Sequence, residues 1–180
     1  MNADFFTSDV LVGLVLLIML VVMFKRLRGN PDLLKPETDL AYELVSHKPE
    51  EAGEDFLKTF ADDPIPEEHD CHLIRLALLN RGISQVSATD FTQPIKLSFA
   101  EGAEILNARY FESFRSPPID NLELEQDGTS LTIPPLTIAK EGMVIFNLIV
   151  RGAAEPDAVT GSLRNQSEMR RLGLTSKVLG

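Results

Sequence analysis

The sequence contains no tryptophan and a single cysteine, Cys71, among its 180 residues. One cysteine cannot form an intramolecular disulfide, so the cysteine content points to no oxidising compartment. The lack of tryptophan excludes the Cys-Trp-Cys core of antibody domains. Any β-sandwich in this chain must therefore be held together by apolar packing, for which a domain of roughly a hundred residues is large enough.

Positive charge is also scarce, because 17 Lys and Arg residues face 27 Asp and Glu residues, a formal net charge of −10. Nucleic-acid binding requires a basic surface, and no stretch of the sequence provides one. Gly-rich phosphate loops and nucleotide fingerprints are missing as well. We therefore expect no nucleic-acid partner, no cofactor and no small-molecule ligand.

The most prominent feature that is present is an uninterrupted apolar run from Val10 to Phe24, VLVGLVLLIMLVVMF. As a helix it spans about 22 Å, and Phe5 and Phe6 extend it towards the hydrocarbon thickness of about 30 Å. Residues 1–9 contain no Lys or Arg, and no Ala-x-Ala pattern follows the run, unlike in a cleaved signal peptide. The sequence predicts a single uncleaved transmembrane helix within residues 1–28, a signal anchor.

Three cations, Lys25, Arg26 and Arg28, follow the apolar run directly. Short cationic flanks remain in the cytoplasm, so we expect the N-terminus outside and residues 25–180 in the cytoplasm. A periplasmic location of the folded domain is the alternative. Gly13 offers a point where another transmembrane helix could pack closely.

Negative charge is concentrated in residues 30–70, which hold thirteen acidic residues and three lysines. We interpret residues 29–70 as an acidic juxtamembrane spacer that anionic headgroups would repel. A docking surface for a basic partner is the alternative. Pro36 and Pro49, each followed by acidic residues, predict the starts of two short helices within the spacer.

From Cys71 onwards the hydrophobic pattern changes to alternation interrupted by turn signals, which is typical of short strands. Asp127-Gly128 predicts a β-hairpin. The sequence therefore predicts an antiparallel β-sandwich of about seven strands over residues 71–164, with 165–180 as a tail. The expected strands are His72–Leu79, Pro94–Phe99, Ala103–Ser113, Leu122–Glu125, Leu131–Ile133, Met143–Val150 and Ala158–Arg164.

Two groups of residues invite a chemical interpretation. The stretch from His69 to His72 contains metal-ligand residue types, but alternation in a strand would turn Cys71 and His72 to opposite faces. We expect polar residues at the start of a strand there, without a metal or a catalytic thiol. Asp90 is expected to cap the turn before Phe91 rather than to act as a base.

Several stretches resemble a recurring bacterial family of membrane-anchored, immunoglobulin-like β-sandwich domains of unknown function. The similarity covers residues 71–164, and Thr137–Gly142 departs from the turn that family members usually place before the penultimate strand. The resemblance implies an immunoglobulin-like fold and an anchored layout, and it implies no catalytic residues. The stretches that carry it are Asn80–Gly82, Asp90–Phe91, Pro94–Ile95, Phe99, Ala103–Ala108 and Leu131–Leu136.

Together these features predict a non-catalytic, membrane-anchored interaction or scaffold protein. Its partners would be the lipid bilayer and a protein of a membrane assembly, to which the sandwich presents loops or an edge strand. One alternative is an accessory or sensory subunit whose transmembrane helix packs specifically against partner helices, with Gly13 at the contact. A third hypothesis is that the chain is an enzyme of unknown activity.

Overall fold

The computed structural model describes residues 19, 25, 35–63, 65–66 and 70–173. The chain divides into two units, residues 1–36 and 37–180, and the second is described here. Gly13, Arg26 and Arg28 lie outside the described residues, whereas Lys25 is described as an exposed helical residue. No helix within these ranges is long and apolar enough to cross a membrane.

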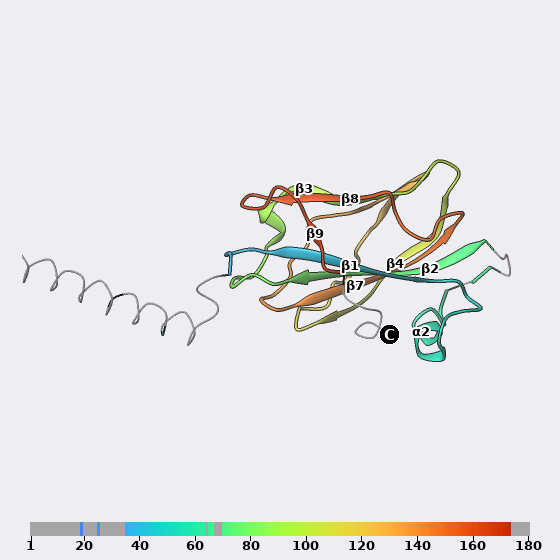
Figure 1. The fold of residues 1–180 in the computed structure, drawn as a ribbon, viewed down its shortest axis with the longest axis horizontal. Helices are drawn as coiled ribbons and strands as arrows, with labels where there is room; N and C mark the ends of the chain where they lie inside the picture. Colours follow the sequence, from blue (N-terminus) through green and yellow to red (C-terminus); the bar gives the residue numbers. More distant parts are fainter. Residues whose placement is uncertain (1–18, 20–24, 26–34, 64, 67–69, 174–180) are drawn as a thin grey trace, which may run out of the picture. The chain divides into compact units, whose positions relative to one another are not determined.

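The second unit consists of two β-sheets, as Figure 1 shows. A five-stranded sheet has the order β4-β7-β2-β1-β9, and a four-stranded sheet has the order β5-β6-β3-β8. Neighbouring strands are antiparallel except β1 and β9, which are parallel. The strands are β1 (Leu40–His47), β2 (Cys71–Asn80), β3 (Phe91–Ser98), β4 (Glu104–Phe114), β5 (Glu125–Asp127), β6 (Ser130–Ile133), β7 (Met143–Arg151), β8 (Ala158–Leu163) and β9 (Arg170–Arg171).

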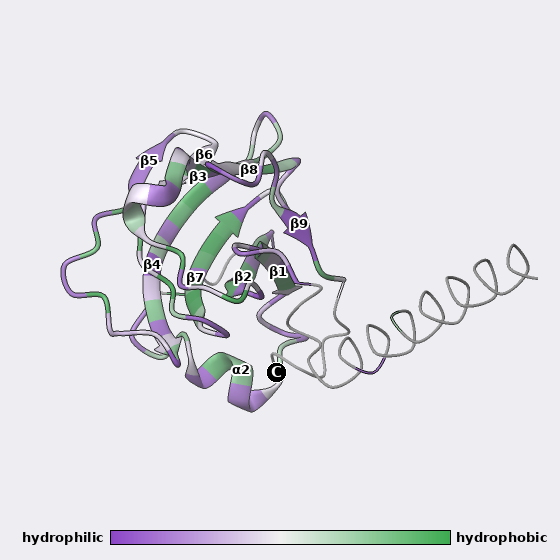
Figure 2. Ribbon diagram, turned by 90° about the vertical axis from the view of Figure 1, so that its left-hand side faces the viewer, coloured by the Kyte–Doolittle hydropathy of each residue, from purple (hydrophilic) through white to green (hydrophobic). Residues whose placement is uncertain are grey.

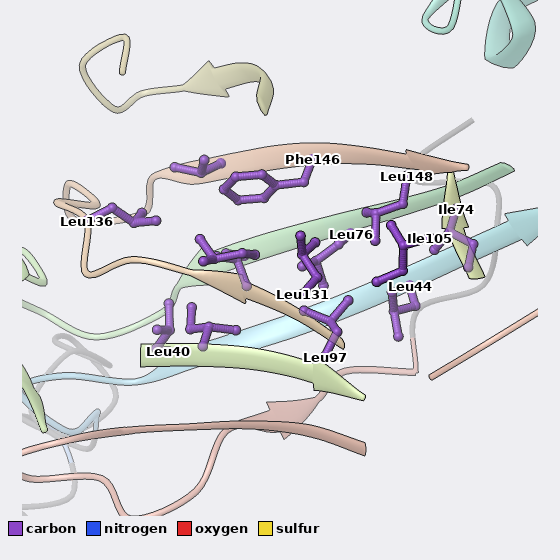
Figure 3. Packing of buried hydrophobic residues seen from close by; sticks show 14 of the residues in the cluster. Leu40, Leu44, Ile74, Leu76, Leu97, Ile105, Leu131, Leu136, Phe146 and Leu148 are labelled. Atoms are coloured by element: carbon purple, nitrogen blue, oxygen red, sulfur yellow. The ribbon is translucent and has the colours of Figure 1, made fainter. Parts of the chain in front are cut away.

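A hydrophobic core fills the space between the two sheets. In Figure 3, Leu76 and Phe146 of the five-stranded sheet lie close to Leu97 and Leu131 of the four-stranded sheet. All four side chains are fully buried. Alternate residues of each strand supply this core, because side chains of a strand point to opposite faces in turn. The predicted mainly-β fold with two packed sheets is confirmed.

The five-stranded sheet is apolar on its outer face as well, where it carries a second core. The helix α2 (Glu54–Lys58) lies over this face. Phe56 of the helix and Phe60, two residues after it, are buried in the second core. A helix of five residues is too short to be stable alone, so these contacts hold it in place. Figure 2 shows β7 as one of the most hydrophobic strands, consistent with burial on both faces. The buried members are Val45, Phe56, Phe60, Leu73, Ala77, Ile145 and Ile149.

The prediction of a helix that starts at Pro36 is wrong, because residues 40–47 form strand β1. Leu40 and Leu44 enter the core between the sheets, whereas Val45 enters the outer core. A strand buried on both faces loses its alternating pattern and resembles the apolar stripe of a helix. Pairing with β2 over all eight residues therefore decides the conformation. Residues 40–47 belong to the sandwich, so they are no part of a spacer.

Other local predictions are confirmed in whole or in part. The second expected helix exists as the shorter α2, which starts after Gly53. The Asp127-Gly128 hairpin joins β5 to β6, with Gly128 at a φ of 57°. Leu122 and Leu124 contact the core without forming a strand, because β5 starts only at Glu125. Asp90 closes a capping box on the 3-10 helix Ala88–Asp90, as its expected turn role requires.

The sandwich has two ends that matter below. Asn80 pairs with Leu40, and Met143 lies between Leu79 of β2 and Phe114 of β4. We call this the Asn80 end; it carries the chain segments 80–83, 114–116 and 139–142. At the opposite Cys71 end, the segments 48–70, 99–103 and 152–157 connect the strands.

Candidate interaction groove along strand β8

Strand β8 forms one edge of the four-stranded sheet, and among the described strands it pairs with β3 alone. The backbone N–H and C=O groups of Leu163 point away from β3, since both bond to Gln166 at 2.8 and 3.1 Å. In an antiparallel ladder every second residue has the same orientation. The backbone groups of Val159 and Gly161 therefore face the open side of the strand, where the described part of the chain supplies no strand partner.

The segment after β8 forms the second wall of a groove. The chain turns back at Leu163 and runs as Ser167–Met169 towards β9. A Cβ placed on Gly161 would lie 3.0 Å from the Met169 sulfur, so glycine lets this segment come close to the strand. The result is an open channel between the edge of one sheet and the segment that crosses to the other.

The groove consists of three adjoining hollows. Their cavity volumes are ≈ 580 Å³ beside Ser162, ≈ 260 Å³ beside Gly161 and ≈ 180 Å³ at the Asn80 end. The first two share Gln93 and Ser167, and the first and last share Leu163, Arg164 and Asn165. Neutral hydrogen-bonding side chains dominate the lining: Thr92, Gln93, Thr160, Ser162, Asn165, Gln166 and Ser167.

The chemistry of this lining suits recognition of uncharged polar groups. The Thr92 and Ser162 hydroxyls bond each other at 2.6 Å. At the Asn80 end, the hydroxyl of Thr38 is buried without a hydrogen-bond partner in the described structure. Hydroxyl and amide groups can both donate and accept, which matches the needs of a peptide backbone. Asp90 lines this part of the groove, but its carboxylate accepts from the Ser87 N–H at 2.8 Å.

The wall of the groove is tied to β1. The Gln166 amide accepts from the Leu40 N–H and donates to the Leu40 carbonyl, at 2.8 and 2.7 Å. Beyond it, the Arg171 guanidinium holds both Glu155 carboxylate oxygens, at 2.8 and 2.9 Å. These bonds lower the pKa of Glu155 and raise the pKa of Arg171. The crossing segment is therefore a fixed wall whose position is set by specific bonds.

A second polar cluster lies under α2, on the outer face of the five-stranded sheet. The Thr59 carbonyl accepts from Arg109 at 2.9 Å and from Asn147 at 2.8 Å, and its hydroxyl bonds Arg75 at 2.7 Å. Asp63 accepts from Arg109 at 2.8 Å. This cluster joins the segment after α2 to three strands, so its arrangement is structural.

Burial explains the electrostatics of this cluster. Arg75 is 7% exposed, and its Cζ lies 4.7 Å from the centre of the Phe56 ring. Desolvation lowers the pKa of Arg75, and the nearby Glu112 carboxylate partly opposes that shift. Guanidinium groups remain charged at neutral pH even after such a shift. Arg75 thus acts as a buried cation packed against an aromatic ring.

The residues weighed for metal or thiol chemistry lie at the start of β2. Cys71 is a buried free cysteine, His72 is half-buried, and His69 lies outside the described residues. Among the described residues, no group of three or more His, Cys, Asp or Glu is arranged to hold a metal. The groove was not predicted from the sequence, because its wall lies in the tail expected from residue 165. The polar run from Arg164 to Ser167, directly after a strand, was the available signal.

Comparisons with known proteins give limited information. No family model matches the chain, and no curated protein matches it. Among solved structures, the chitin-binding domain of a hyperthermophilic chitinase from Pyrococcus furiosus matches with a TM-score of 0.38 at 12% identity. That match covers 71% of this chain and 90% of that domain.

A second similar structure is a GH20 exo-β-N-acetylglucosaminidase from Vibrio harveyi, solved as an inactive mutant. It matches with a TM-score of 0.39 at 10% identity, over 75% of this chain. The matched part spans 18% of the enzyme. At such TM-scores, neither likeness carries an argument about ligand or activity.

Proposed function

We propose that this chain is a non-catalytic, single-pass membrane-anchored interaction protein. Its sandwich binds an extended segment of a protein partner, which adds a strand to the outer side of β8. The observation that carries the proposal is the open edge of β8, with Val159 and Gly161 directed into a groove of hydroxyl and amide side chains. Strand addition draws affinity from backbone bonds and specificity from flanking side chains.

Two properties of the groove favour a peptide over a charged ligand. Its central hollow is lined by neutral polar groups, with Arg164 as the charged exception. In addition, β8 has the small side chain of Ser162 at the central hollow, whereas Met169 already fills the space beside Gly161. The longer edge strand β4 is a weaker candidate, because its two register shifts each place an extra residue in β4 itself, whereas the two shifts of the β3–β8 pair place theirs in β3. Bulges are a common means of protecting a sheet edge.

The anchored, cytoplasmic and immunoglobulin-like parts of the proposal rest on the sequence. The apolar run Val10–Phe24 and the cations Lys25, Arg26 and Arg28 favour a helix with the sandwich on the cytoplasmic side. The strand order β4-β7-β2-β1 resembles the D-E-B-A sheet of immunoglobulin domains. The β5-β6 hairpin follows β4 in the chain, which is a departure from that pattern.

Site-specific photocrosslinking in native membranes tests the groove. A photoreactive amino acid replaces Ser167 in the groove wall or, as a control, Glu123, an exposed residue outside the groove. We expect a discrete protein adduct from position 167 and none from position 123. Equal labelling from both positions, or none from position 167, contradicts the proposed binding edge.

A pair of substitutions at one residue tests strand addition itself. Val159→Pro removes a backbone N–H directed away from β3, so the β3 ladder keeps its bonds. Val159→Ala trims the same side chain and keeps the N–H. We expect the proline variant to lose the crosslinked adduct and the alanine variant to retain it, with equal circular dichroism. Loss of the adduct in both variants would show that the partner contacts the Val159 side chain rather than its backbone N–H, and would contradict strand addition.

A further inference from the structure

The acidic residues expected to separate the sandwich from the membrane lie elsewhere in the fold. The described residues between β1 and β2, which are 48–63, 65–66 and 70, hold seven acidic residues and two lysines, a net charge of −5. They connect β1 to β2 at the Cys71 end. Exposed acidic residues of the neighbouring connections, Glu101 and Asp157, lie at the same end. Negative charge therefore gathers on one end of the sandwich.

The chain enters the sandwich at the opposite end. The Glu37 carbonyl accepts from the Ser84 N–H at 3.0 Å, and the Asp39 carbonyl accepts from the Arg81 N–H at 2.8 Å. These bonds fix residues 37–39 against the segment 80–83. Only eight residues, 29–36, separate Arg28 from this attachment, and even fully extended they reach about 28 Å. An anchor that ends at Arg28 would therefore hold this attachment within about 28 Å of the membrane surface.

The same end carries the exposed large hydrophobic side chains of the sandwich. Among the described residues of the second unit, these are Ile83 at 38% and Phe114 at 56% exposure. Phe114 ends β4 beside Met143, and Ile83 follows the end of β2. Two such side chains beside the point where the chain enters the sandwich are suited to the interface between headgroups and acyl chains.

Cations accompany these apolar side chains. Arg81, Arg115 and Lys140 are exposed at the Asn80 end, and Arg115 lies over the Phe114 ring with its Cζ 5.4 Å from the ring centre. The acidic residue Glu141 is also there and bonds Arg115 at 3.2 Å. Glu37 is exposed at the same end. The Asn80 end thus carries cations and carboxylates in similar numbers, whereas acidic residues far outnumber the two lysines at the Cys71 end.

From this polarity we infer that the Asn80 end of the sandwich rests on the bilayer surface. Ile83 and Phe114 enter the interface, Arg81, Arg115 and Lys140 contact lipid phosphates, and the acidic Cys71 end points away from the membrane. Repulsion between that acidic end and anionic headgroups favours the same orientation. The inference rests on the proposed anchoring. It leaves the two larger hollows of the β8 groove, beside Ser162 and Gly161, accessible to a partner, whereas the smallest hollow lies at the Asn80 end itself.

The absence of tryptophan from the chain allows a direct test. Single-tryptophan variants of the full-length chain, Ile83→Trp and Phe114→Trp, are reconstituted into vesicles whose lipids are brominated near the headgroup end of the acyl chains. Asp157→Trp, at an exposed position of the Cys71 end, is the matched control. Brominated lipid quenches tryptophan only on contact, so emission reports which end touches the membrane.

We expect a blue shift and loss of emission for the first two variants, and neither for Asp157→Trp. Equal emission from all three variants in chains that float with the vesicles overturns the orientation while the anchor stands. Chains that do not float with the vesicles overturn the anchoring, and the orientation with it. Circular dichroism checks that each variant is folded.

Lipid composition tests the cations. Vesicles of phosphatidylcholine alone are compared with vesicles that also contain phosphatidylglycerol. We expect stronger quenching of the Phe114→Trp variant in the anionic vesicles, and loss of that gain when Arg81→Glu and Lys140→Glu are added. Lys96→Glu, on an exposed residue of β3, should leave the gain intact. Equal quenching in both lipid mixtures overturns the attraction of these cations to anionic headgroups.

Discussion

The side-chain amide of Gln166 bonds both backbone groups of Leu40, from the N–H at 2.8 Å and to the carbonyl at 2.7 Å. One side chain thus takes the place of a neighbouring strand residue at the start of β1. It closes that edge of the five-stranded sheet and also positions a wall of the groove. Structure and proposed binding are therefore coupled at one residue.

Removing that amide should destabilise the sandwich. We expect Gln166→Ala to lower the free energy of unfolding by about 1–3 kcal/mol, because it leaves partly buried backbone groups without partners. Chemical denaturation measures the loss, and hydrogen exchange should show faster exchange at Leu40. Asn165→Ala, at an exposed neighbour, is the control and should change little. Equal effects of the two variants would contradict this role for Gln166.

The ion pair between Asp63 and Arg109 should contribute more to the stability of the fold than an ion pair at the surface does. The Asp63 side chain is 4% exposed, and its two oxygens accept from Arg109 and from Asn107, each at 2.8 Å. We expect Asp63→Ala to cost about 2 kcal/mol, since it leaves both donors unpaired. A double-mutant cycle with Arg109→Ala measures the coupling between the two side chains. A coupling near zero would show that the pair contributes nothing specific.

Gly82 should not tolerate a side chain. A Cβ there would lie 2.5 Å from the Glu37 carbonyl oxygen and 2.8 Å from the Thr38 Cα, both of them backbone atoms. We expect Gly82→Ala to lower stability by about 1–3 kcal/mol, as overpacking does. Gly53→Ala is the control, because nothing lies within 4 Å of its Cβ position. The melting temperature of Gly82→Ala should fall, whereas that of Gly53→Ala should stay close to the unaltered chain. An equal fall in both variants would refute the close approach at Gly82.

The bonds between Glu155 and Arg171 predict a pH dependence. The hydrogen bonds from Arg171 hold the pKa of Glu155 below the usual glutamate value of 4.5. Its contribution to stability is thus complete well above pH 4.5 and is lost as the pH falls through the lower folded value. Both groups are largely exposed, so we expect less than about 1 kcal/mol. Glu155→Gln should be less stable than the unaltered chain at pH 7 and equal to it at low pH. A pH-independent difference would contradict this assignment.

Membrane topology can be measured separately. A reporter fused after Gly180 should be active in its cytoplasmic form and inactive in its periplasmic form, because three cations follow the apolar run. Replacing Lys25, Arg26 and Arg28 with neutral residues should weaken this preference. Periplasmic activity of the unaltered fusion would reverse the proposed orientation and leave the fold untouched.

Sequence patterns predicted much of the fold and little of the groove. The apolar run of β7 and the Asp127-Gly128 hairpin carry local signals that depend on neighbouring residues only. Strand β1 was mistaken for a helix because both of its faces are buried. The wall of the groove depends on a bond between Gln166 and Leu40, which are 126 residues apart. The hydrophobic periodicity of a short stretch of sequence cannot indicate a contact between residues so far apart.

The adjacency of β1 and β9 has a consequence for biosynthesis. The first strand of the sandwich pairs on one side with β2, and in the part of the chain that the structure describes its other side is closed by Gln166 and β9 alone. During translation, β1 must therefore wait with an open edge until nearly all of the domain has left the ribosome. Such sequence-distant contacts slow folding, and an open edge can pair with other chains meanwhile. Nascent chains that stop before Arg164 would keep that edge open.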